Sequence, residues 1–311
     1  MRIGFLGNFG VSYSSETHHA ASLEQLGHTV LRCQETVATA DQIAALDVDT
    51  LVWIKTHGWN TPSITAAIDV LRKRRIPIVT YHLDLYMPLA DRWRQYQHDP
   101  YLTQLDWFFT VDPQMAEWLS VHTDVQGRFL PAGVYGDECY ISDKPSPHAN
   151  DVVFVGARGY HPEHPWRPQL IDWLRATYGP RFTHVGGDGD TGTLRGDDLN
   201  RMYASSKIAV GDTLCPNFNY VGYASDRMFE CPGRGGFSLF PAIPGTDDWY
   251  HNGTEIVRYT YGDFDGLKSL IDYYLDHDDE REKIRHGGHH RTVTDHTYTR
   301  RWQKILDTVF R

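Results

Sequence analysis

Short apolar runs alternate with amphipathic stretches along the N-terminal part of the chain. The runs are rich in β-branched and aromatic residues, as buried strands are. The strands predicted from them cover residues 2–6, 28–31, 50–54, 76–81, 107–111 and 128–130. Helical patterns lie between most of these strands, the first over residues 14–26, where Gly27 ends it. This order is typical of βαβ units on a parallel sheet, so the pattern predicts an α/β domain.

The alternation breaks once and then resumes. Residues 135–150 are polar and contain several Asp, Ser and Pro residues, which predicts a linker between domains. Beyond it, the predicted strands cover residues 152–155, 182–185, 208–210 and 237–240. The predicted helices cover residues 167–178, 197–204, 226–231, 264–276 and 298–310. A second Rossmann-like domain is therefore expected over residues 151–295.

The length and charge of the chain narrow its class. With 311 residues it exceeds the usual size of one hydrophobic core, so two domains are expected. The 30 Lys and Arg residues against 40 Asp and Glu residues give a formal net charge of -10. An acidic balance disfavours a broad nucleic-acid-binding surface, although it does not exclude nucleic acid as a partner.

The cysteines show neither the paired spacing of a zinc site nor a disulfide framework. They are Cys33, Cys139, Cys215 and Cys231. We expect reduced thiols, as in a cytoplasmic protein. The sequence also lacks an apolar stretch long enough for a signal peptide or a membrane span. These features predict a cytoplasmic protein without membrane insertion, and they leave its oligomeric state open.

Residues 225–236 combine a predicted helix with charged residues and glycines. Arg227 and Glu230 fall on one helix face by their spacing. An arginine there can bind a diphosphate, which the free N–H groups of the first helical turn also favour. A carboxylate one turn later can accept hydrogen bonds from ribose hydroxyls. Gly235 and Gly236 would let the backbone come close to a ligand. The alternative is a surface ion pair followed by a plain glycine cap.

This segment resembles the R-x-F-E-x-x-x-x-G-G signature of the CgeB-type, spore maturation protein-like glycosyltransferases, a branch of the two-domain GT-B enzymes. Residues 151–158 are similar to the strand and glycine turn that open the donor domain of that family, and Arg167 stands where the family has an arginine. Residues 199–210 resemble its L-x-x-x-Y-x-x-S-K-I-x-L step, and residues 296–302 its closing H-T-Y-x-x-R helix. The ordered set covers most of residues 151–311.

The resemblance implies a GT-B fold, which is α/β with two Rossmann-like domains facing across a cleft. Residues 1–134 would form the acceptor-side domain and 135–150 the linker. Residues 151–295 would bind the nucleotide sugar, and 296–311 would form a helix that crosses back to the first domain. The implied enzyme is a metal-independent glycosyltransferase that moves a sugar from a nucleotide diphosphate sugar, expected to be UDP-linked, to an acceptor hydroxyl. The donor is a co-substrate, and no cofactor is implied. The acceptor stays open among a glycan, a metabolite, a protein and a hydroxymethylated DNA base.

The implied donor site draws on glycine loops and charged side chains. Arg158 and Arg227 would stabilise the leaving diphosphate, where charge develops, and Glu230 would bind the ribose. The loop after the first strand contains Gly7 and Gly10 but lacks the G-x-G-x-x-G spacing of a nicotinamide-binding loop. The donor-site residues expected in all are Gly7, Gly10, Gly156, Arg158, Asp212, Tyr223, Arg227, Glu230, Gly235 and Gly236.

Acceptor chemistry is expected from the first domain. His18 is a candidate general base for the acceptor hydroxyl, with a solvated helix residue as the equal alternative, and His19 is expected to be solvated. Asp84 is the preferred carboxylate, with capping of a loop as the equal alternative, and alternation along the strand places it on the same side as His82. Aromatic residues near these positions could line an acceptor cleft or pack in the core. They are Trp53, Trp59, Tyr81 and Tyr86.

One departure from the family pattern leaves the stereochemical outcome open. Retaining GT-B enzymes carry two glutamates eight positions apart, and the position eight before Glu230 is Gly222. Tyr220, Tyr223 or Asp226 could hold the donor sugar instead. The missing glutamate also supports an alternative function, a catalytically silent nucleotide-sugar-binding or scaffold protein of the same fold.

No metal site is expected. Asp188 and Asp190 have the spacing of a D-x-D motif, but they lie in a glycine-rich turn that we interpret as a loop. Four histidines could be considered as metal ligands, but their spacing matches no standard metal site. They are His161, His164, His289 and His290.

Overall fold

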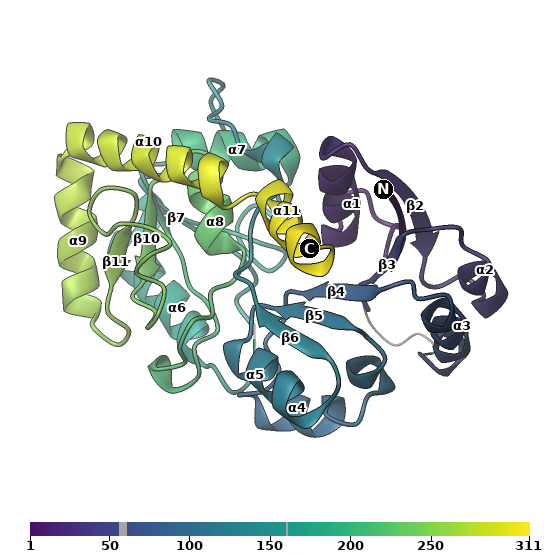
Figure 1. The fold of residues 1–311 in the computed structure, drawn as a ribbon. Helices are drawn as coiled ribbons and strands as arrows, with labels where there is room; N and C mark the ends of the chain where they lie inside the picture. Colours follow the sequence, from purple (N-terminus) through teal and green to yellow (C-terminus); the bar gives the residue numbers. More distant parts are fainter. Residues whose placement is uncertain (56–60, 160) are drawn as a thin grey trace. The chain divides into compact units, whose positions relative to one another are not determined.

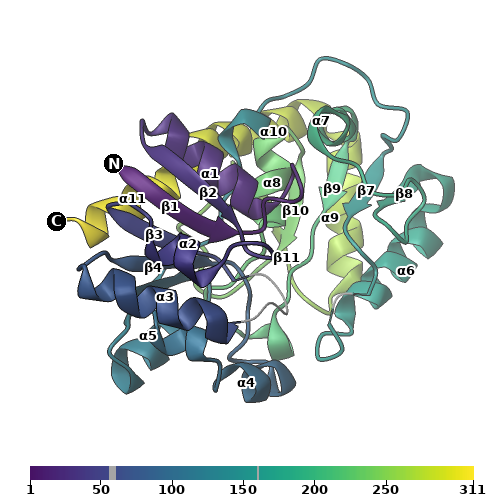
Figure 2. The same ribbon diagram turned by 90° about the vertical axis from the view of Figure 1, so that its right-hand side faces the viewer.

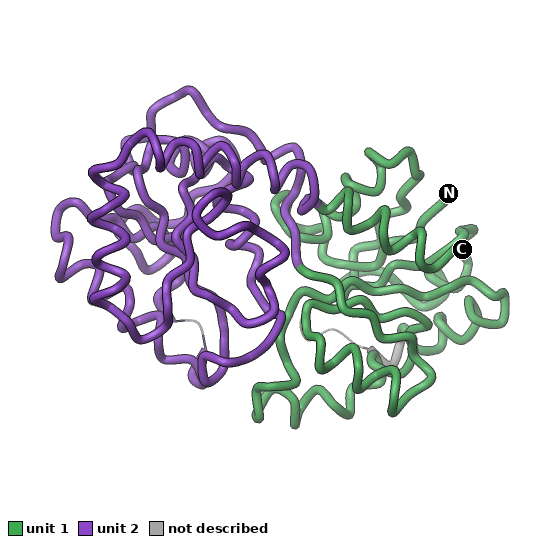
Figure 3. Tube along the Cα trace, turned by 60° about the vertical axis from the view of Figure 1, so that its left-hand side comes forward, with its two compact units in different colours: residues 1–131, 298–311 green, residues 132–297 purple. Residues whose placement is uncertain are grey.

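The structure is a computed structural model that describes residues 1–55, 61–159 and 161–311, with the backbone alone for residues 61–63. It divides into two compact units (Figure 3). Unit 1 comprises residues 1–131 and 298–311, and unit 2 comprises residues 132–297. Within the described ranges, none of the helices combines the length with the apolar composition that a bilayer span requires.

Unit 1 contains a six-stranded parallel sheet in the order β2-β1-β3-β4-β5-β6 (Figure 1). Its strands are β1 (Arg2–Gly7), β2 (Thr29–Gln34), β3 (Thr50–Trp53), β4 (Ile78–His82), β5 (Trp107–Thr110) and β6 (Gln126–Phe129). Every residue of β3 and β4 is buried, because helices cover both faces of a parallel sheet. The helices are α1 (Ser15–Gln25), α2 (Ala40–Ala44), α3 (Thr61–Lys73), α4 (Ala90–Tyr96), α5 (Pro113–His122) and α11 (Tyr298–Val309).

The C-terminal helix α11 belongs to unit 1 and packs beside α1 (Figures 1 and 2). Trp302 of α11 is fully buried, and its Nε1–H donates a hydrogen bond to Nδ1 of His19 at 3.1 Å. Phe5 and Tyr81 contact the same indole ring edge-on. The last helix therefore completes the core of the first unit, as the sequence predicted.

Unit 2 contains a five-stranded sheet in the order β11-β10-β9-β7-β8, and Figure 2 shows β9, β7 and β8 side by side. All its strand pairs are parallel. The strands are β7 (Val152–Val155), β8 (Phe182–Val185), β9 (Ile208–Val210), β10 (Ser238–Pro241) and β11 (Val257–Tyr259). The helices are α6 (Trp166–Tyr178), α7 (Gly196–Ser205), α8 (Arg227–Gly233), α9 (Phe264–Asp276) and α10 (Asp278–Asp295).

Two elements of unit 2 have no counterpart among the predicted ones. Strand β11 is only three residues long, and helix α10 shows little apolar periodicity. Three acidic residues in the first turn favour the start of helix α10, and two glycines lie further along it. A Cβ on Gly287 or Gly288 would collide with the carbonyl oxygens of Thr254 and Glu255, so only glycine lets this helix lie so close to that loop.

Residues 135–150, expected as a linker, are part of unit 2 in the structure. The side-chain amide of Asn200 donates to the carbonyl oxygens of Glu138 and Tyr140 at 2.8 and 2.9 Å. The hydroxyl of Tyr140 donates to Asp197 at 2.8 Å. This polar segment is thus fastened to α7, and the chain passes between the units at residues 131–132 and 297–298.

Candidate donor site

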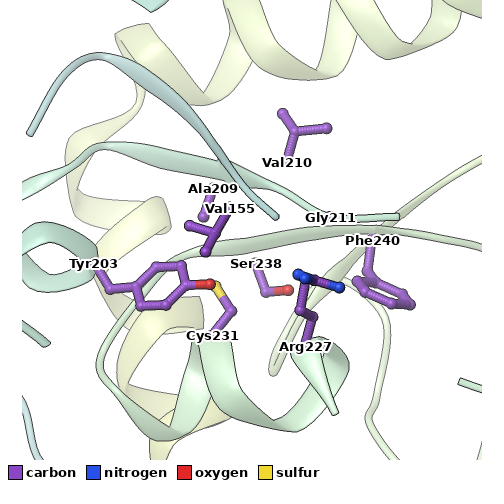
Figure 4. Close-up of a pocket in the computed structure, with 9 residues that line it drawn as sticks. All are labelled: Val155, Tyr203, Ala209, Val210, Gly211, Arg227, Cys231, Ser238 and Phe240. Atoms are coloured by element: carbon purple, nitrogen blue, oxygen red, sulfur yellow. The ribbon is translucent and has the colours of Figure 1, made fainter. Parts of the chain in front are cut away.

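A small cavity lies at the carboxyl end of the sheet in unit 2 (Figure 4). Its volume is about 10 Å³, room for about one water molecule. Strands β7, β9 and β10 line it together with helices α7 and α8. The lining residues are Val155, Tyr203, Ala209, Val210, Gly211, Arg227, Cys231, Ser238 and Phe240. Because open parallel sheets bind ligands beyond the carboxyl ends of their strands, the rim of this cavity is the candidate site.

Two glycines bring backbone and side chains together at this edge. Gly156 follows β7 with a φ of 140°, and a Cβ on it would stand 2.7 Å from Nη2 of Arg227. Its N–H donates to the carbonyl of Val185 at 2.8 Å, and its carbonyl accepts from Nε2 of His184 at 2.6 Å. Gly156 is therefore fixed on both sides, and only the absence of a side chain leaves room for the guanidinium. Gly211 likewise leaves room for the ring of Phe240.

Arg227 is the first residue of α8, and its side chain points into the group of residues around the cavity (Figure 4). Its Nε is buried and has no hydrogen-bond partner among the described residues. Buried polar atoms in proteins are almost always hydrogen-bonded, so an arginine at a cavity with an unpaired Nε is a candidate for binding an anion. Helix α8 has only seven residues, with Pro232 inside it, so the positive charge here comes from Arg227 and not from a long helix dipole.

Glu230 lies one turn further along α8 and is paired within the protein. Its Oε1 accepts from Nε of Arg234 at 3.2 Å. Arg234 also donates to the carboxylate of Glu138 and to Oδ1 of Asn200. Burial lowers the pKa of Arg234, but the carboxylates of Glu230 and Glu138 outweigh burial and hold that pKa above its usual value. The sequence analysis missed Arg234, although its four-residue spacing from Glu230 is a visible signal.

Arg158, the other arginine expected at the diphosphate, forms an ion pair with Asp172 of α6. Its backbone N–H donates to the carboxylate of Asp188. The pKa of Arg158 is raised by its hydrogen bond to Asp172, and the side chain does not line the cavity. Its role at the leaving group stays a prediction, and its contacts in this structure direct the guanidinium to the surface of α6.

Asp212 follows β9 and is fully buried. Its Oδ2 accepts from Nε of Arg167 at 2.9 Å, and its Oδ1 accepts from the hydroxyl of Tyr261 at 3.3 Å. His164 lies 3.5 Å from the same Oδ1. The arginine that the family resemblance singled out thus pairs with the aspartate predicted for the donor site, and together they hold β9 to the start of α6.

The remaining donor-side candidates of unit 2 are buried against protein. A Cβ on Gly235 would stand 2.9 Å from Ile141, and one on Gly236 would stand 2.6 Å from Sγ of Cys231. Tyr223 is also buried. The two glycines thus let the backbone approach neighbouring side chains. Gly235, Gly236 and Tyr223 do not line the cavity.

In unit 1, Gly7 is the buried last residue of β1, and Gly10 lies exposed in the loop that follows. A Cβ on Gly7 would stand 2.9 Å from the side chain of Glu16, whereas Gly10 has ordinary space around it. His18 is half-buried on α1. The expectation of a solvated His19 is wrong, because its ring is fully buried against Trp302, and burial lowers its pKa to about 3.

Asp84 follows β4 and is exposed, at the edge of the sheet where ligands bind. His82, the last residue of β4, is buried against the rings of Tyr86 and Tyr96. Asp84 is thus exposed whereas His82 is buried, and strand β4 ends between them. Burial lowers the pKa of His82, while the charges of Asp84 and Asp112 oppose that shift.

The aromatic residues considered for an acceptor cleft divide between core and edge. Trp53 and Tyr81 are fully buried, and Tyr86 is half-buried and stacks on Tyr96. Trp59 lies outside the described residues. Core packing thus explains Trp53 and Tyr81. Tyr86 is partly exposed to solvent.

The carboxylates of the D-x-D sequence accept hydrogen bonds that hold the loop after β8. Asp188 accepts from the backbone of Arg158, and Asp190 accepts from the backbone of His184 and from Arg175. Among the described residues, no three His, Cys, Asp or Glu side chains gather as a metal site would need.

Residues 167–307 match a family model described as glycosyl transferase-like. No curated protein sequence matches the chain. Solved structures match it over nearly its whole length. One is an alpha-glucosyltransferase in complex with UDP-glucose and DNA containing an abasic site, with a TM-score of 0.71, 12% identity, and 100% of both chains covered. Another is Anabaena HepE in complex with UDP and glucose, with a TM-score of 0.65, 14% identity, and 99% of both chains covered.

A glycosyltransferase from Rickettsia africae matches with a TM-score of 0.62 and 12% identity, over 100% of this chain and 98% of that one. At such identities the likeness establishes the fold. The two parallel sheets, their helices and the returning C-terminal helix make up the GT-B fold of glycosyltransferases, as the sequence predicted.

Proposed function

We propose that this protein is a glycosyltransferase of the CgeB-type branch, which transfers a sugar from a UDP-linked donor to an acceptor hydroxyl. The family match over residues 167–307 and the shared GT-B fold support the reaction class. UDP is supported by the nucleotide in the complexes of the alpha-glucosyltransferase and of HepE. The observation that carries the proposal is Arg227, whose buried Nε has no hydrogen-bond partner among the described residues and which lines the cavity at the carboxyl end of the sheet.

Arg227 would bind the diphosphate of the donor. The cavity is too small for a nucleotide, so the donor would lie across its rim, over Gly156 and Gly211. As the glycosidic bond breaks, negative charge grows on the diphosphate, and a fixed guanidinium stabilises that charge more than it stabilises the bound donor. Glu230 would accept hydrogen bonds from the ribose. Arg158 is a second candidate for the diphosphate, and it would first have to leave Asp172.

We propose that the reaction needs no divalent metal. The support is the engagement of Asp188 and Asp190, whose carboxylates hold the loop after β8 through backbone N–H groups. Arg227 would supply the positive charge that a metal supplies elsewhere. Acceptors compatible with this proposal are a glycan, a metabolite, a protein or a hydroxymethylated DNA base, and the net charge of -10 disfavours DNA.

Calorimetry with UDP tests the donor site. Arg227→Ala should weaken UDP binding about tenfold to a hundredfold, since a hydrogen-bonded charge pair is lost. Arg158→Ala should weaken it less. Arg175→Ala is the matched control, because Arg175 forms a surface ion pair with Asp190 in the same unit. Equal affinities for wild type and Arg227→Ala would overturn the assignment of Arg227.

A second candidate function, a silent nucleotide-sugar-binding protein, is favoured by one observation. Gly222 stands where retaining relatives would have their first glutamate, and its φ of 78° suits glycine. Hydrolysis of UDP-glucose without an acceptor separates the two candidates. Slow release of glucose by the wild type, lost in Arg227→Ala, supports the transferase. Tight binding of UDP-glucose with no release, even with acceptors present, supports the silent binder.

A further inference from the structure

Arg234 lies at the end of α8, and three different segments of unit 2 hold its guanidinium in place. It is 2% exposed. Nε donates to Glu230, Nη1 to Oδ1 of Asn200 and to the carbonyl of Gly196, and Nη2 to Glu138. A planar guanidinium with this many directional bonds cannot rotate without breaking several of them. Arg234 is therefore a rigid support for Glu230.

Glu230 uses only one of its two carboxylate oxygens within the described protein. Oε1 accepts from Arg234, and no donor among the described residues reaches Oε2. The side chain is 23% exposed. A carboxylate clamped at one oxygen has the other oxygen directed at a fixed position, so it can select a ligand hydroxyl at that position.

The charges around Arg234 fit a hydroxyl better than a phosphate. Two carboxylates, from Glu230 and Glu138, share one guanidinium, so the cluster keeps an excess negative charge. Such a cluster repels an anion and attracts hydrogen-bond donors. Arg227, three residues before Glu230, supplies the cation for the diphosphate. Helix α8 thus presents a cationic position followed by an anionic one, the order that a nucleoside diphosphate requires.

We propose that Arg234 is a positioning residue that aims Oε2 of Glu230 at the ribose hydroxyls of the donor and so makes the site selective for ribonucleotides. This inference rests on the proposed function. Glu138 takes part through the same guanidinium, and it lies in the segment that enters unit 2 from residue 131. Asn200 fixes Glu138 in turn by bonding its carbonyl oxygen.

The test compares binding of UDP, 2′-deoxy-UDP and 3′-deoxy-UDP by calorimetry. Wild type should bind UDP about tenfold more tightly than at least one deoxy form. This is the affinity that one hydrogen bond to a charged group contributes. Glu230→Ala should abolish this preference. Arg234→Gln should reduce it to about threefold or less by weakening UDP alone, because a deoxy form never made the contact. Arg234→Lys should retain part of the preference, since lysine keeps the positive charge but lacks the planar guanidinium with its several hydrogen-bond donors.

Arg281→Lys is the matched control. Arg281 is also a buried arginine of unit 2, and it bonds to the carbonyl of Tyr274. This variant should melt at a lower temperature with the wild-type preference intact. If Arg234→Gln does not fold, Arg234→Lys carries the test. Folded Arg234 variants with the wild-type preference, or a wild type that binds UDP without any preference, would overturn the inference and leave the proposed function standing. A wild type that binds none of UDP, ADP and GDP would overturn the proposed function itself.

Discussion

The guanidinium of Arg227 occupies the space that a side chain on Gly156 would need. A Cβ on Gly156 would stand 2.7 Å from Nη2, 2.8 Å from Cζ and 2.9 Å from Nε of Arg227. The end of β7 and the start of α8 are thus fitted to each other through one arginine. Any residue larger than glycine at position 156 must displace the cation that we assign to the diphosphate.

Gly156→Ala should therefore weaken UDP binding about tenfold or more, because the methyl group pushes Arg227 away from its place. The variant also carries backbone strain on the order of 1–3 kcal/mol from its positive φ. Gly179→Ala is the control, since Gly179 has a φ of 51° and nothing within 4 Å of an added Cβ. Both variants should melt earlier than wild type, but only Gly156→Ala should lose affinity in calorimetry. Equal affinities in the two variants would contradict the prediction.

Asp84→Asn and His18→Ala should leave UDP affinity nearly unchanged, because Arg227 and Glu230 belong to the other unit. Transfer should fall about a hundredfold in whichever variant loses the general base. Radiolabelled UDP-glucose with a panel of glycan, protein and hydroxymethylated DNA acceptors provides the assay. If both variants transfer at the wild-type rate, the base is neither residue, and His82 is the next candidate.

Turnover of UDP-glucose should persist in EDTA, since arginine supplies the positive charge in our proposal. The double variant Asp188→Asn with Asp190→Asn should also keep its turnover, although the loop after β8 loses charged acceptors. Loss of activity in EDTA with rescue by manganese would count against this proposal. It would make Asp188 and Asp190 the candidate metal ligands.

The free energy of unfolding should decrease as the pH is lowered, because of His19. Its pKa is lowered to about 3 in the folded state by burial and by the neighbouring charge of His18. Below the ordinary pKa of 6.5, His19 binds a proton in the unfolded chain but stays neutral in the folded chain. This contribution is fully present above pH 6.5 and is lost as the pH falls, by about 1.4 kcal/mol per pH unit until the folded pKa is reached.

His19→Asn should have a shallower acid dependence, because asparagine can still accept from Trp302 Nε1–H and takes up no proton. Urea unfolding at pH 7.5, 6 and 5 measures the difference. His82, whose pKa burial also lowers, is present in both proteins and cancels. His98→Asn, at an exposed position, should keep the wild-type slope. An unchanged slope in His19→Asn would show that His19 does not carry the effect.

Most of the fold was predictable, because its strands are short apolar runs separated by helical periodicity. Every strand predicted from such a run is present within three residues of its expected bounds, the largest difference being the end of β2. The exceptions follow from packing that leaves no local signal. Helix α10 depends on the fit of Gly287 and Gly288 against a loop, and β11 is three residues of edge strand beside β10.

The candidate site was predictable only where its residues lie on one element. Arg227 and Glu230 share α8, so their spacing placed them together. The partners of Arg234 come from three separate segments, and no spacing in the sequence relates Glu138 to Asn200. Asp212 and Arg158 carry the right charges, but folding commits them to Arg167 and Asp172. Sequence reasoning finds charge and cannot tell which charges the protein has already paired.

The return of α11 to unit 1 means that this unit is synthesised in two parts, with unit 2 between them. Residues 132–297 are translated in one continuous stretch, so unit 2 has all its parts before residues 298–311 are made. Until Trp302 arrives, His19, Phe5 and Tyr81 lack the ring that buries them. Domains usually finish folding from the N-terminus onward during synthesis. In this chain, every residue of unit 2 is translated before the helix that completes the core of unit 1.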